Sequence, residues 1–328
     1  MTPRPLAALP KAHLHIHLEG GMRPGTLRDL AEGYGMEVPA IRGYGSFSAF
    51  SDTYVAACGV LRTEADWRRL VREAVEDAAA AGAVWIEPAT YPPRHLDRLG
   101  PVDEVMAIAI DEAATAGRRW GVGVGFLVAA DRTLDPSDAM AQAELAARFA
   151  GRGVSSFGLH NDEGLPATEP ERFAGAFAVA RRAGLLSCPH AGELAGPASV
   201  RGALDALGAD RIQHGVRAVE DPALLDRLAA GGTCLDVCPT SNCMLSVVAS
   251  IEEHPLPALL AAGVRCSVNA DDPLLFGPGL LEEYELCRDR LRLSDEQLAF
   301  VARCSIDAGA APEDVKARAR AGIDAWLA

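Results

Sequence analysis

No apolar run in this sequence is long enough to span a bilayer, although 49% of its 328 residues are hydrophobic. Such a composition is typical of a globular chain that can bury a sizeable core. The first ten residues lack both the basic start and the apolar centre of a signal peptide. We therefore expect a cytoplasmic protein with no membrane partner.

Basic residues and paired cysteines are also scarce. The 45 Asp and Glu residues outnumber the 31 Lys and Arg residues, which gives a formal net charge of −14. This balance argues against a nucleic-acid partner, because affinity for nucleic acid depends on neutralising phosphates.

None of the eight cysteines forms a Cys-x-x-Cys pair. We expect buried free thiols, and no structural zinc site among Cys234, Cys238 and Cys243, whose spacing is irregular.

Strand-like and helix-like segments alternate along the chain. Eight short apolar runs are typical of buried strands: 12–17, 83–87, 121–129, 155–159, 185–190, 211–214, 233–238 and 265–269. Amphipathic helical segments separate many of them: 64–81, 103–116, 136–150, 169–183, 197–207 and 222–230. This alternation predicts an α/β fold, a closed (β/α)8 TIM barrel in which residues 1–328 form one domain. A barrel needs only roughly 250 residues, so we also predict a helical insertion after the first strand, at about 20–63, and a C-terminal helical tail.

Polar side chains follow the predicted strands at the points where the strands end. They are His15 and His17, Glu87, His160, His190 and Glu193, His214, and Asp271 and Asp272. The active sites of (β/α)8 barrels are built at the carboxyl ends of the strands, from several strands at once. The sequence therefore predicts that these side chains meet at one mouth of the barrel.

Four of these side chains predict a metal site. His15 and His17 are two residues apart on a strand, which places both imidazoles on one face. With His190 and Asp271 they provide the nitrogen and oxygen ligands that zinc prefers, with a position left for water. Each has an ordinary alternative when taken alone, namely a chance histidine such as His13, a core histidine or a turn aspartate. Their joint position at strand ends favours a metal.

Three further polar residues remain for chemistry on a metal-activated water. Zinc lowers the pKa of a bound water towards neutrality, and a neighbouring group must orient that water. His214 suits this role. Glu193, three residues after a predicted ligand, can move a proton to or from the substrate, and Asp272 can accept a hydrogen bond from water or substrate.

The chain resembles the adenosine deaminase family over nearly its whole length. The motifs that carry the resemblance are Pro10-Lys-Ala-His-Leu-His15-Ile-His17-Leu-Glu-Gly20, His190-Ala-Gly-Glu193, His214-Gly215, Cys238-Pro-Thr-Ser-Asn242, His254-Pro-Leu256, Asp271-Asp272-Pro273 and Glu283-Tyr284. The resemblance implies a barrel with one Zn2+ per chain and hydrolytic replacement of a purine 6-amino group by oxygen, with release of ammonia. It also implies that Glu193 protonates the purine N1. His214 would orient and deprotonate the water, and Asp272 would hydrogen-bond N7 and the attacking hydroxide.

Three departures from the family pattern bear on the substrate. Adenosine-specific members carry Asp where this chain has Glu19, and that carboxylate faces the ribose. The glycine whose amide would meet purine N3 is Asn161 here, and the segment Glu87-Pro88-Ala89 lacks the usual Arg. We therefore name Glu19, Asn161 and Asp272 as substrate-binding residues. We expect a small-molecule adenine nucleoside as substrate, favouring 6-aminodeoxyfutalosine, a menaquinone precursor, over adenosine, with free adenine as the alternative.

A two-metal site bridged by a carboxylated lysine is excluded, because Lys11 and Lys316 are the only lysines and neither is near the fourth strand. The Pro-Cys-x-x-Cys half of a cytidine-deaminase zinc site is absent. His160 either lines the substrate pocket or is exposed. The chain could also be a catalytically inactive nucleoside-binding relative, although no ligand or proton-transfer residue is missing.

The predicted insertion carries apolar side chains at near-helical spacing, namely Phe47, Phe50, Tyr54, Val55 and Leu61. They either pack onto the barrel or form a lid over the substrate that excludes water. The sequence leaves both open, and it does not predict an oligomeric state.

Overall fold

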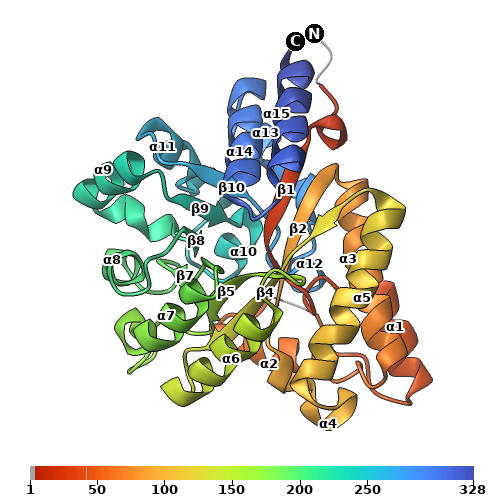
Figure 1. The fold of residues 1–328 in the computed structure, drawn as a ribbon. Helices are drawn as coiled ribbons and strands as arrows, with labels where there is room; N and C mark the ends of the chain where they lie inside the picture. The colour runs from red at the N-terminus through yellow and green to blue at the C-terminus, as the bar shows by residue number, and fades with distance from the viewer. Residues whose placement is uncertain (1–3, 42) are drawn as a thin grey trace.

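The structure, a computed structural model, describes residues 4–41 and 43–328 (Figure 1). Met1–Pro3 of the predicted start, and Arg42 in the predicted insertion, lie outside the described residues. The strands are β1 (Lys11–His17), β2 (Ala83–Thr90), β3 (Gly123–Val124), β4 (Phe126–Asp131), β5 (Val154–His160), β6 (Leu186–Ser187), β7 (His190–Ala191), β8 (Arg211–His214), β9 (Cys234–Val237) and β10 (Cys266–Val268).

These strands correspond to the eight predicted runs, because two of the runs are each divided in two. Strands β3 and β4 are separated at Gly125, where the ring of Trp85 lies so close that an added Cβ would approach it to 2.8 Å. Strands β6 and β7 are separated by Cys188 and Pro189, and proline has no N–H to donate to a ladder. The division is therefore local and leaves the predicted strand order intact.

The strands close into a parallel barrel. One sheet has the order β1-β2-β4-β5-β6 and the other β10-β9-β8-β7, and all their pairings are parallel. The two sheets meet where Cys188 N donates to Phe157 O at 2.9 Å and Gln213 N donates to Pro189 O at 2.9 Å. They meet again beside β10, where His17 N donates to Asp271 O at 3.0 Å. The predicted (β/α)8 barrel is confirmed.

The helices are α1 (Pro24–Gly33), α2 (Phe47–Cys58), α3 (Glu64–Ala80), α4 (Leu96–Leu99), α5 (Val102–Trp120), α6 (Pro136–Phe149), α7 (Ala174–Arg182), α8 (Pro197–Asp205), α9 (Pro222–Gly231), α10 (Pro239–Met244), α11 (Leu256–Ala261), α12 (Pro273–Phe276), α13 (Leu280–Asp289), α14 (Asp295–Ala308) and α15 (Glu313–Leu327). Most of the helices surround the barrel, whereas the short helices α10 and α12 lie inside this ring in the view of Figure 1. The predicted helices are present, and the predicted helix 169–183 begins with a 3-10 turn, Pro170–Phe173, before α7.

The insertion and the C-terminal segment differ in their relation to the barrel. Helices α1 and α2 form the insertion between β1 and α3, as predicted. In the C-terminal segment, α14 packs against β1 and β10 and so belongs to the outer ring of barrel helices. The C-terminal helices are therefore part of the barrel wall as well as a tail. Among the described helices, none combines the length and apolarity that crossing a membrane requires.

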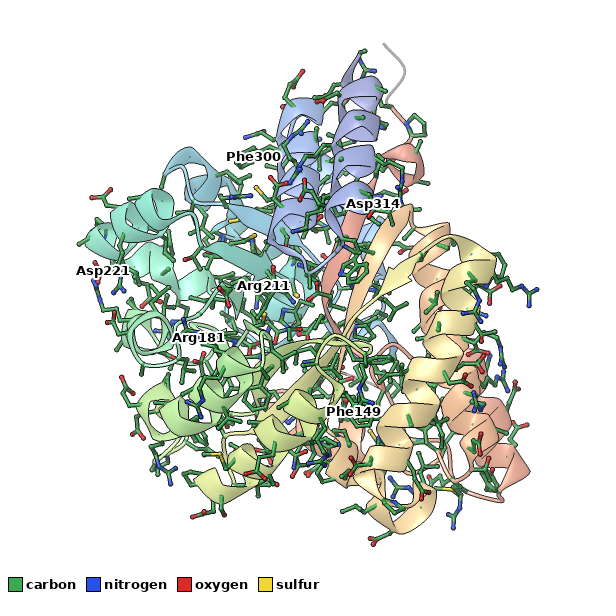
Figure 2. All side chains as sticks on the ribbon, in the orientation of Figure 1. Phe149, Arg181, Arg211, Asp221, Phe300 and Asp314 are labelled. Carbon is green, nitrogen blue, oxygen red and sulfur yellow. The ribbon has the colours of Figure 1, made fainter. Side chains whose placement is uncertain are left out.

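One predicted strand end is misplaced. Strand β2 continues to Thr90, so Glu87 lies inside the barrel and not at its mouth. There its carboxylate accepts from Arg211 Nη2 at 2.6 Å and from Trp85 Nε1 at 2.8 Å. Arg211 also donates to Asp236 at 2.7 Å, and Figure 2 labels it near the middle of the molecule. These fully buried charges are paired, as buried charges must be, and they fill the barrel below the mouth.

The cysteines are free thiols, and all but Cys243 are buried, which confirms the prediction. The groups of side chains able to hold a metal among the described residues contain no cysteine.

Candidate metal and substrate site

Side chains from β1, β7, β8 and the segment after β10 meet at one mouth of the barrel. Ligand atoms of His15, His190, His214 and Asp271 all lie within 4.8 Å of one another, and Asp271 also groups with His17 and Asp272. Oδ1 of Asp271 lies 3.2 Å from His15 Nε2 and 3.3 Å from His17 Nε2. The structure thus brings together the four predicted metal ligands, and it adds His214 to the same cluster.

The cluster has the free ligand atoms that a cation needs. His15 Nε2 and Asp271 Oδ1 are buried and have no hydrogen-bond partner among the described residues. Main-chain carbonyls lie against the opposite ring nitrogens, with Asp236 O 3.1 Å from His15 Nδ1 and Leu159 O 3.1 Å from His190 Nδ1. Each carbonyl accepts from Nδ1–H and leaves the Nε2 lone pair directed into the cluster, which is the usual arrangement around a metal-binding histidine.

The backbone around the site is strained. Asn161, His214 and Asp271 have φ values of +79°, +63° and +59°, in the left-handed region that side chains other than glycine rarely adopt. Strain of this kind persists where the surrounding structure over-determines it, and it is concentrated at functional sites.

The short helix α10, after β9, positions two of the cluster residues. Ser241 Oγ donates to Asp271 Oδ2 at 2.7 Å, and Asn242 Nδ2 donates to His214 Nδ1 at 3.1 Å. Leu256 N donates to His254 Nδ1 at 3.1 Å, so neutral His254 carries its proton on Nε2, 3.2 Å from Asn242 Oδ1. This chain of hydrogen bonds leaves the proton of neutral His214 on Nε2, which faces the site.

Ser241, Asn242 and His254 contributed to the resemblance, but no role could be given to them from the sequence. The only local signal was a run of polar residues directly after a strand.

His214 Nε2 lies 3.4 Å from Glu193 Oε1 and 3.7 Å from Asp271 Oδ2. In this tautomer His214 is a hydrogen-bond donor towards whatever lies between these carboxylates.

Glu193 is buried beside the cluster, in a loop held by a second carboxylate. Burial, and then the charge of Asp271, raise the pKa of Glu193 well above its ordinary value. The carboxylate of Glu163 accepts from the main-chain N–H groups of Gly192, Glu193 and Ala195 at 3.1, 2.5 and 3.0 Å, and from Ser199 Oγ at 2.6 Å. Glu163 was not among the predicted site residues, although it lies only two residues after Asn161.

A second buried group, Arg132, supports the same loop. Its Nη2 donates to the main-chain oxygen of His190 at 2.5 Å, and its Nη1 lies 3.6 Å from Glu163. Arg132 and Glu163 therefore fix both ends of the segment that carries His190 and Glu193. No sequence pattern singled out Arg132.

Asp272 faces the cluster from the loop after β10. Burial, and then the adjacent Asp271, raise its pKa well above the ordinary value. Its Oδ1 is buried and without a partner among the described residues. A Cβ on Gly20 would lie 1.7 Å from this oxygen, so only glycine allows the carboxylate to occupy this position.

The predicted substrate residue Glu19 is bound by its own chain. Its Oε1 lies 2.7 Å from His95 Nε2 and accepts from Thr90 Oγ1 at 3.1 Å, while Oε2 accepts from Tyr54 on α2 at 2.9 Å. The hydrogen bond from His95 leads the causes that lower the pKa of Glu19, against the opposing effect of burial, and the pKa falls to about 2. Glu19 therefore ties helix α2 to the barrel.

The other predicted substrate residue, Asn161, lines the pocket but directs its side chain to the protein. Its Nδ2 donates to Asp131 Oδ2 at 2.8 Å. Asn161 thus adopts a backbone conformation typical of glycine, and its side chain is held away by the aspartate.

A pocket next to the cluster is covered by the insertion. Its walls are His17, Phe47, Phe50, Ser51, Tyr54, Arg94, His160, Asn161, His190, Glu193, His214, Leu245, Asp271 and Asp272. Phe50 stacks on Phe276 with ring centroids 5.2 Å apart, so α2 also packs on the short helix α12 that follows β10. Of the predicted apolar residues, Leu61 is buried in the core, whereas Val55 is 49% exposed and belongs neither to the core nor to the pocket.

The remaining histidines of this region have distinct positions. His160 lines the pocket, and its ring centroid lies 6.0 Å from that of His17, outside the metal cluster. The sequence allowed His160 either to line the substrate pocket or to be exposed, and the structure places it in the pocket wall. His13 is buried and accepts from Ala270 N at 3.3 Å, so it supports the contact between β1 and the loop after β10.

Comparison with known proteins agrees with this site. The model of the family described as adenosine deaminase matches residues 10–326. The chain is 45% identical to a Streptomyces coelicolor protein named putative adenosine/adenine deaminase, over 99% of this chain and 98% of the relative. The crystal structure of adenine deaminase from Arthrobacter aurescens is 30% identical, with a TM-score of 0.89 and 99% of each chain covered. A zinc-bound amidohydrolase from Burkholderia ambifaria is 28% identical, with a TM-score of 0.87, covering 98% of this chain and 92% of that one.

The family match, the identity to named deaminases and the shared barrel agree with one another, and the buried His/Asp cluster lies where the barrel places its chemistry. The chain is a hydrolytic deaminase of adenine compounds and belongs to the adenosine deaminase family.

Proposed function

We propose that this enzyme hydrolyses the 6-amino group of an adenine nucleoside with one Zn2+ per chain, in a single domain over which residues 20–63 form a lid. The observation that carries the proposal is the buried cluster at the barrel mouth, where His15, His17, His190 and Asp271 meet beside Glu193. Water adds at C6 of the purine, ammonia leaves, and a 6-oxopurine remains.

The donor set fits zinc. The partnerless, buried His15 Nε2 and Asp271 Oδ1 are the atoms that a cation would engage, and imidazole with carboxylate is a usual zinc environment. The zinc-bound relative from Burkholderia ambifaria supports the same metal here. When bound, zinc would supply the Lewis acidity that makes water a nucleophile near neutral pH.

Three side chains would then move or direct protons. Glu193, whose burial raises its pKa and favours the protonated carboxyl, would donate a proton to the ring nitrogen N1. His214 would orient the water through its Nε2–H. The sequence had suggested that His214 also deprotonates the water, but in the tautomer set by Asn242 its Nε2 already carries a proton. Asp272, whose raised pKa favours the protonated carboxyl, would donate a hydrogen bond to purine N7, and its other oxygen would accept one from the attacking water.

The substrate we propose is an adenine nucleoside, with 6-aminodeoxyfutalosine favoured over adenosine, bound near Glu19, Asn161 and Asp272. Free adenine is the second candidate, and one observation favours it. Both carboxylate oxygens of Glu19 already accept from the protein, so a ribose hydroxyl would reach Glu19 only after Tyr54 is displaced. The similarity to an adenine deaminase from Arthrobacter aurescens supports the same alternative.

The test is ammonia release from adenosine, adenine and 6-aminodeoxyfutalosine, with kcat/KM measured before and after treatment with a chelator. We expect turnover of the nucleosides, loss of activity on chelation and recovery with zinc. The highest kcat/KM for adenosine would show that Glu19 and Asn161 do not set specificity. Failure to deaminate any 6-aminopurine with zinc bound would identify an inactive nucleoside-binding relative and refute the proposal.

A further inference from the structure

One cationic side chain in the pocket has no role in the proposed chemistry. Arg94, in the 3-10 turn after β2, is the only lysine or arginine among the described residues that line this pocket. No carboxylate of the described residues lies within 4.0 Å of its guanidinium. By contrast, Arg23, Arg68 and Arg132 each have a carboxylate oxygen within that distance. An arginine that faces a pocket without an anionic partner is an available anion-binding group.

The position of Arg94 is fixed by aromatic rings and not by acids. Its guanidinium carbon lies 5.2 Å from the ring centroid of Tyr54 and 5.8 Å from that of Tyr91. Cation–π contacts of this kind orient a guanidinium without using its N–H donors. Tyr54 belongs to α2, so the arginine and the insertion bound the same part of the pocket.

The two carboxylates whose charges act on Arg94 are both occupied. Glu19 accepts from His95, Thr90 and Tyr54. Asp131 accepts from the amide and hydroxyl of Thr133 at 2.9 and 2.6 Å, and from Asn161 at 2.8 Å. Because both are already hydrogen-bonded, neither neutralises the guanidinium by direct pairing.

His160 provides a second free polar atom in the same part of the pocket. Its side chain is more than nine-tenths buried, and Nε2 has no hydrogen-bond partner among the described residues. Burial lowers the pKa of His160 to about 3, so its imidazole stays neutral and Nε2 can serve as a hydrogen-bonding group. The ring of His160 contacts that of Tyr91, with centroids 5.7 Å apart.

We propose that Arg94, assisted by His160, binds an anionic group on the tail of the purine substrate, a carboxylate or a phosphate attached through the ribose 5′ position. The inference rests on the proposed function, since it assumes a purine in the pocket with its 6-amino group at the metal cluster. Arg94 lies over the ring of Tyr54, whose hydroxyl donates to Glu19, the residue near which we propose that the ribose binds. A neutral tail of the same size leaves the guanidinium unpaired.

The experiment compares tails that differ in charge. The substrates are adenosine, adenosine 5′-monophosphate, adenosine 5′-carboxylate and 5′-methylthioadenosine, the last having a neutral substituent. We expect the zinc-loaded enzyme to prefer an anionic tail, and Arg94→Met to lower the ratio of kcat/KM for the anionic to the neutral compound about 10–100-fold, the size of a lost charge-assisted contact. Whether phosphate or carboxylate gives the larger ratio decides which anion is the natural one.

Binding of deamination products tests the inference without catalysis. Titration calorimetry with inosine and inosine 5′-monophosphate should show a preference for the phosphate that falls with ionic strength, is lost in Arg94→Met and is partly retained in Arg94→Lys. Arg119→Met is the matched control, since Arg119 lies over the Trp120 ring at 5.2 Å on the exposed face of α5, away from the pocket. Thermal unfolding of each variant verifies folding.

Two results would overturn the inference while leaving the proposed function intact. One is equal use of charged and neutral tails by the unmodified enzyme. The other is an equal effect of Arg94→Met on both kinds of tail, which would mean that Arg94 only packs against Tyr54. Absence of turnover with every one of these compounds, and with 6-aminodeoxyfutalosine and adenine, would instead refute the proposed function, and the calorimetry would still report on Arg94.

Discussion

Replacing Glu163 by glutamine should disturb the position of Glu193, the proposed proton-transfer group, without changing the chemistry of its carboxyl. Two carboxylate oxygens of Glu163 receive three main-chain N–H groups, from Gly192, Glu193 and Ala195, and the hydroxyl of Ser199. Glutamine keeps one oxygen, which can still accept from Glu193 and Ala195. Its NH2 group then faces the N–H of Gly192, so one buried donor loses its acceptor.

The expected loss of folding stability follows from the hydrogen bonds that this substitution removes. An orphaned buried donor costs about 1–3 kcal/mol, and the bonds that remain lose their assistance from the carboxylate charge. We therefore expect the free energy of unfolding to fall by about 2–3 kcal/mol. With an unfolding entropy of about 2.1 cal/mol/K per residue, that loss lowers Tm of the 328-residue chain by about 3–4 °C.

The rate should fall more steeply than the stability. Glu163 holds the loop that carries Glu193, and misplacement of a reacting group by about 1 Å can lower a rate about 10²-fold. Steady-state ammonia release, with bound zinc quantified by elemental analysis, should show a reduced kcat at full metal occupancy. Glu169→Gln, at an exposed position nearby, is the control for handling and charge. A wild-type kcat and Tm in Glu163→Gln would refute the view that this carboxylate positions Glu193.

Three further predictions concern the metal, the proton and the pH dependence of stability. His17→Ala should abolish activity and lower the zinc measured by elemental analysis, and a full zinc complement in that variant would contradict its assignment as a ligand. Glu193→Gln should keep the metal and lose about 10²–10⁴-fold in kcat, as expected of a general acid, so retained activity would mean that another group protonates the ring. Glu283 on α13 lies 3.3 Å from Thr240 N, and burial raises its pKa from 4.5 to about 8. The folded state thus binds the proton more tightly than the unfolded state. This stabilisation is fully present below pH 4.5 and is lost as pH rises through 8, by up to about 5 kcal/mol. Urea unfolding at several pH values should show the decline in the wild-type enzyme and a flatter curve in Glu283→Gln, whose amide oxygen can still accept from Thr240. Equal pH dependence in the two proteins would exclude this carboxyl as the cause.

The strands, and the cluster of side chains proposed to bind the metal, were predictable from the sequence because both depend on local patterns. Alternating apolar residues define a strand whatever its neighbours are, and all eight predicted runs form barrel strands. Once parallel strands close into a barrel, their carboxyl ends share one mouth, so His15, His17, His190 and Asp271 had to converge. Glu87 was misplaced because β2 continues through Pro88 to Thr90, three residues beyond the predicted end.

The tertiary structure decided which side chains support and surround this cluster. Glu163 reaches Ser199 across 36 positions, Asn242 reaches His214 across 28, and His95 reaches Glu19 across 76. None of these pairs leaves a periodic or spacing signal, because a hydrogen bond between distant segments depends only on where the fold places their ends. For the same reason, the sequence could not show that Glu19 is bound by the insertion or that Arg94 faces the pocket unpaired. Local sequence patterns determined the strands and the histidines and aspartate at their ends, and the packing of distant segments determined the hydrogen-bond partner of each buried charge.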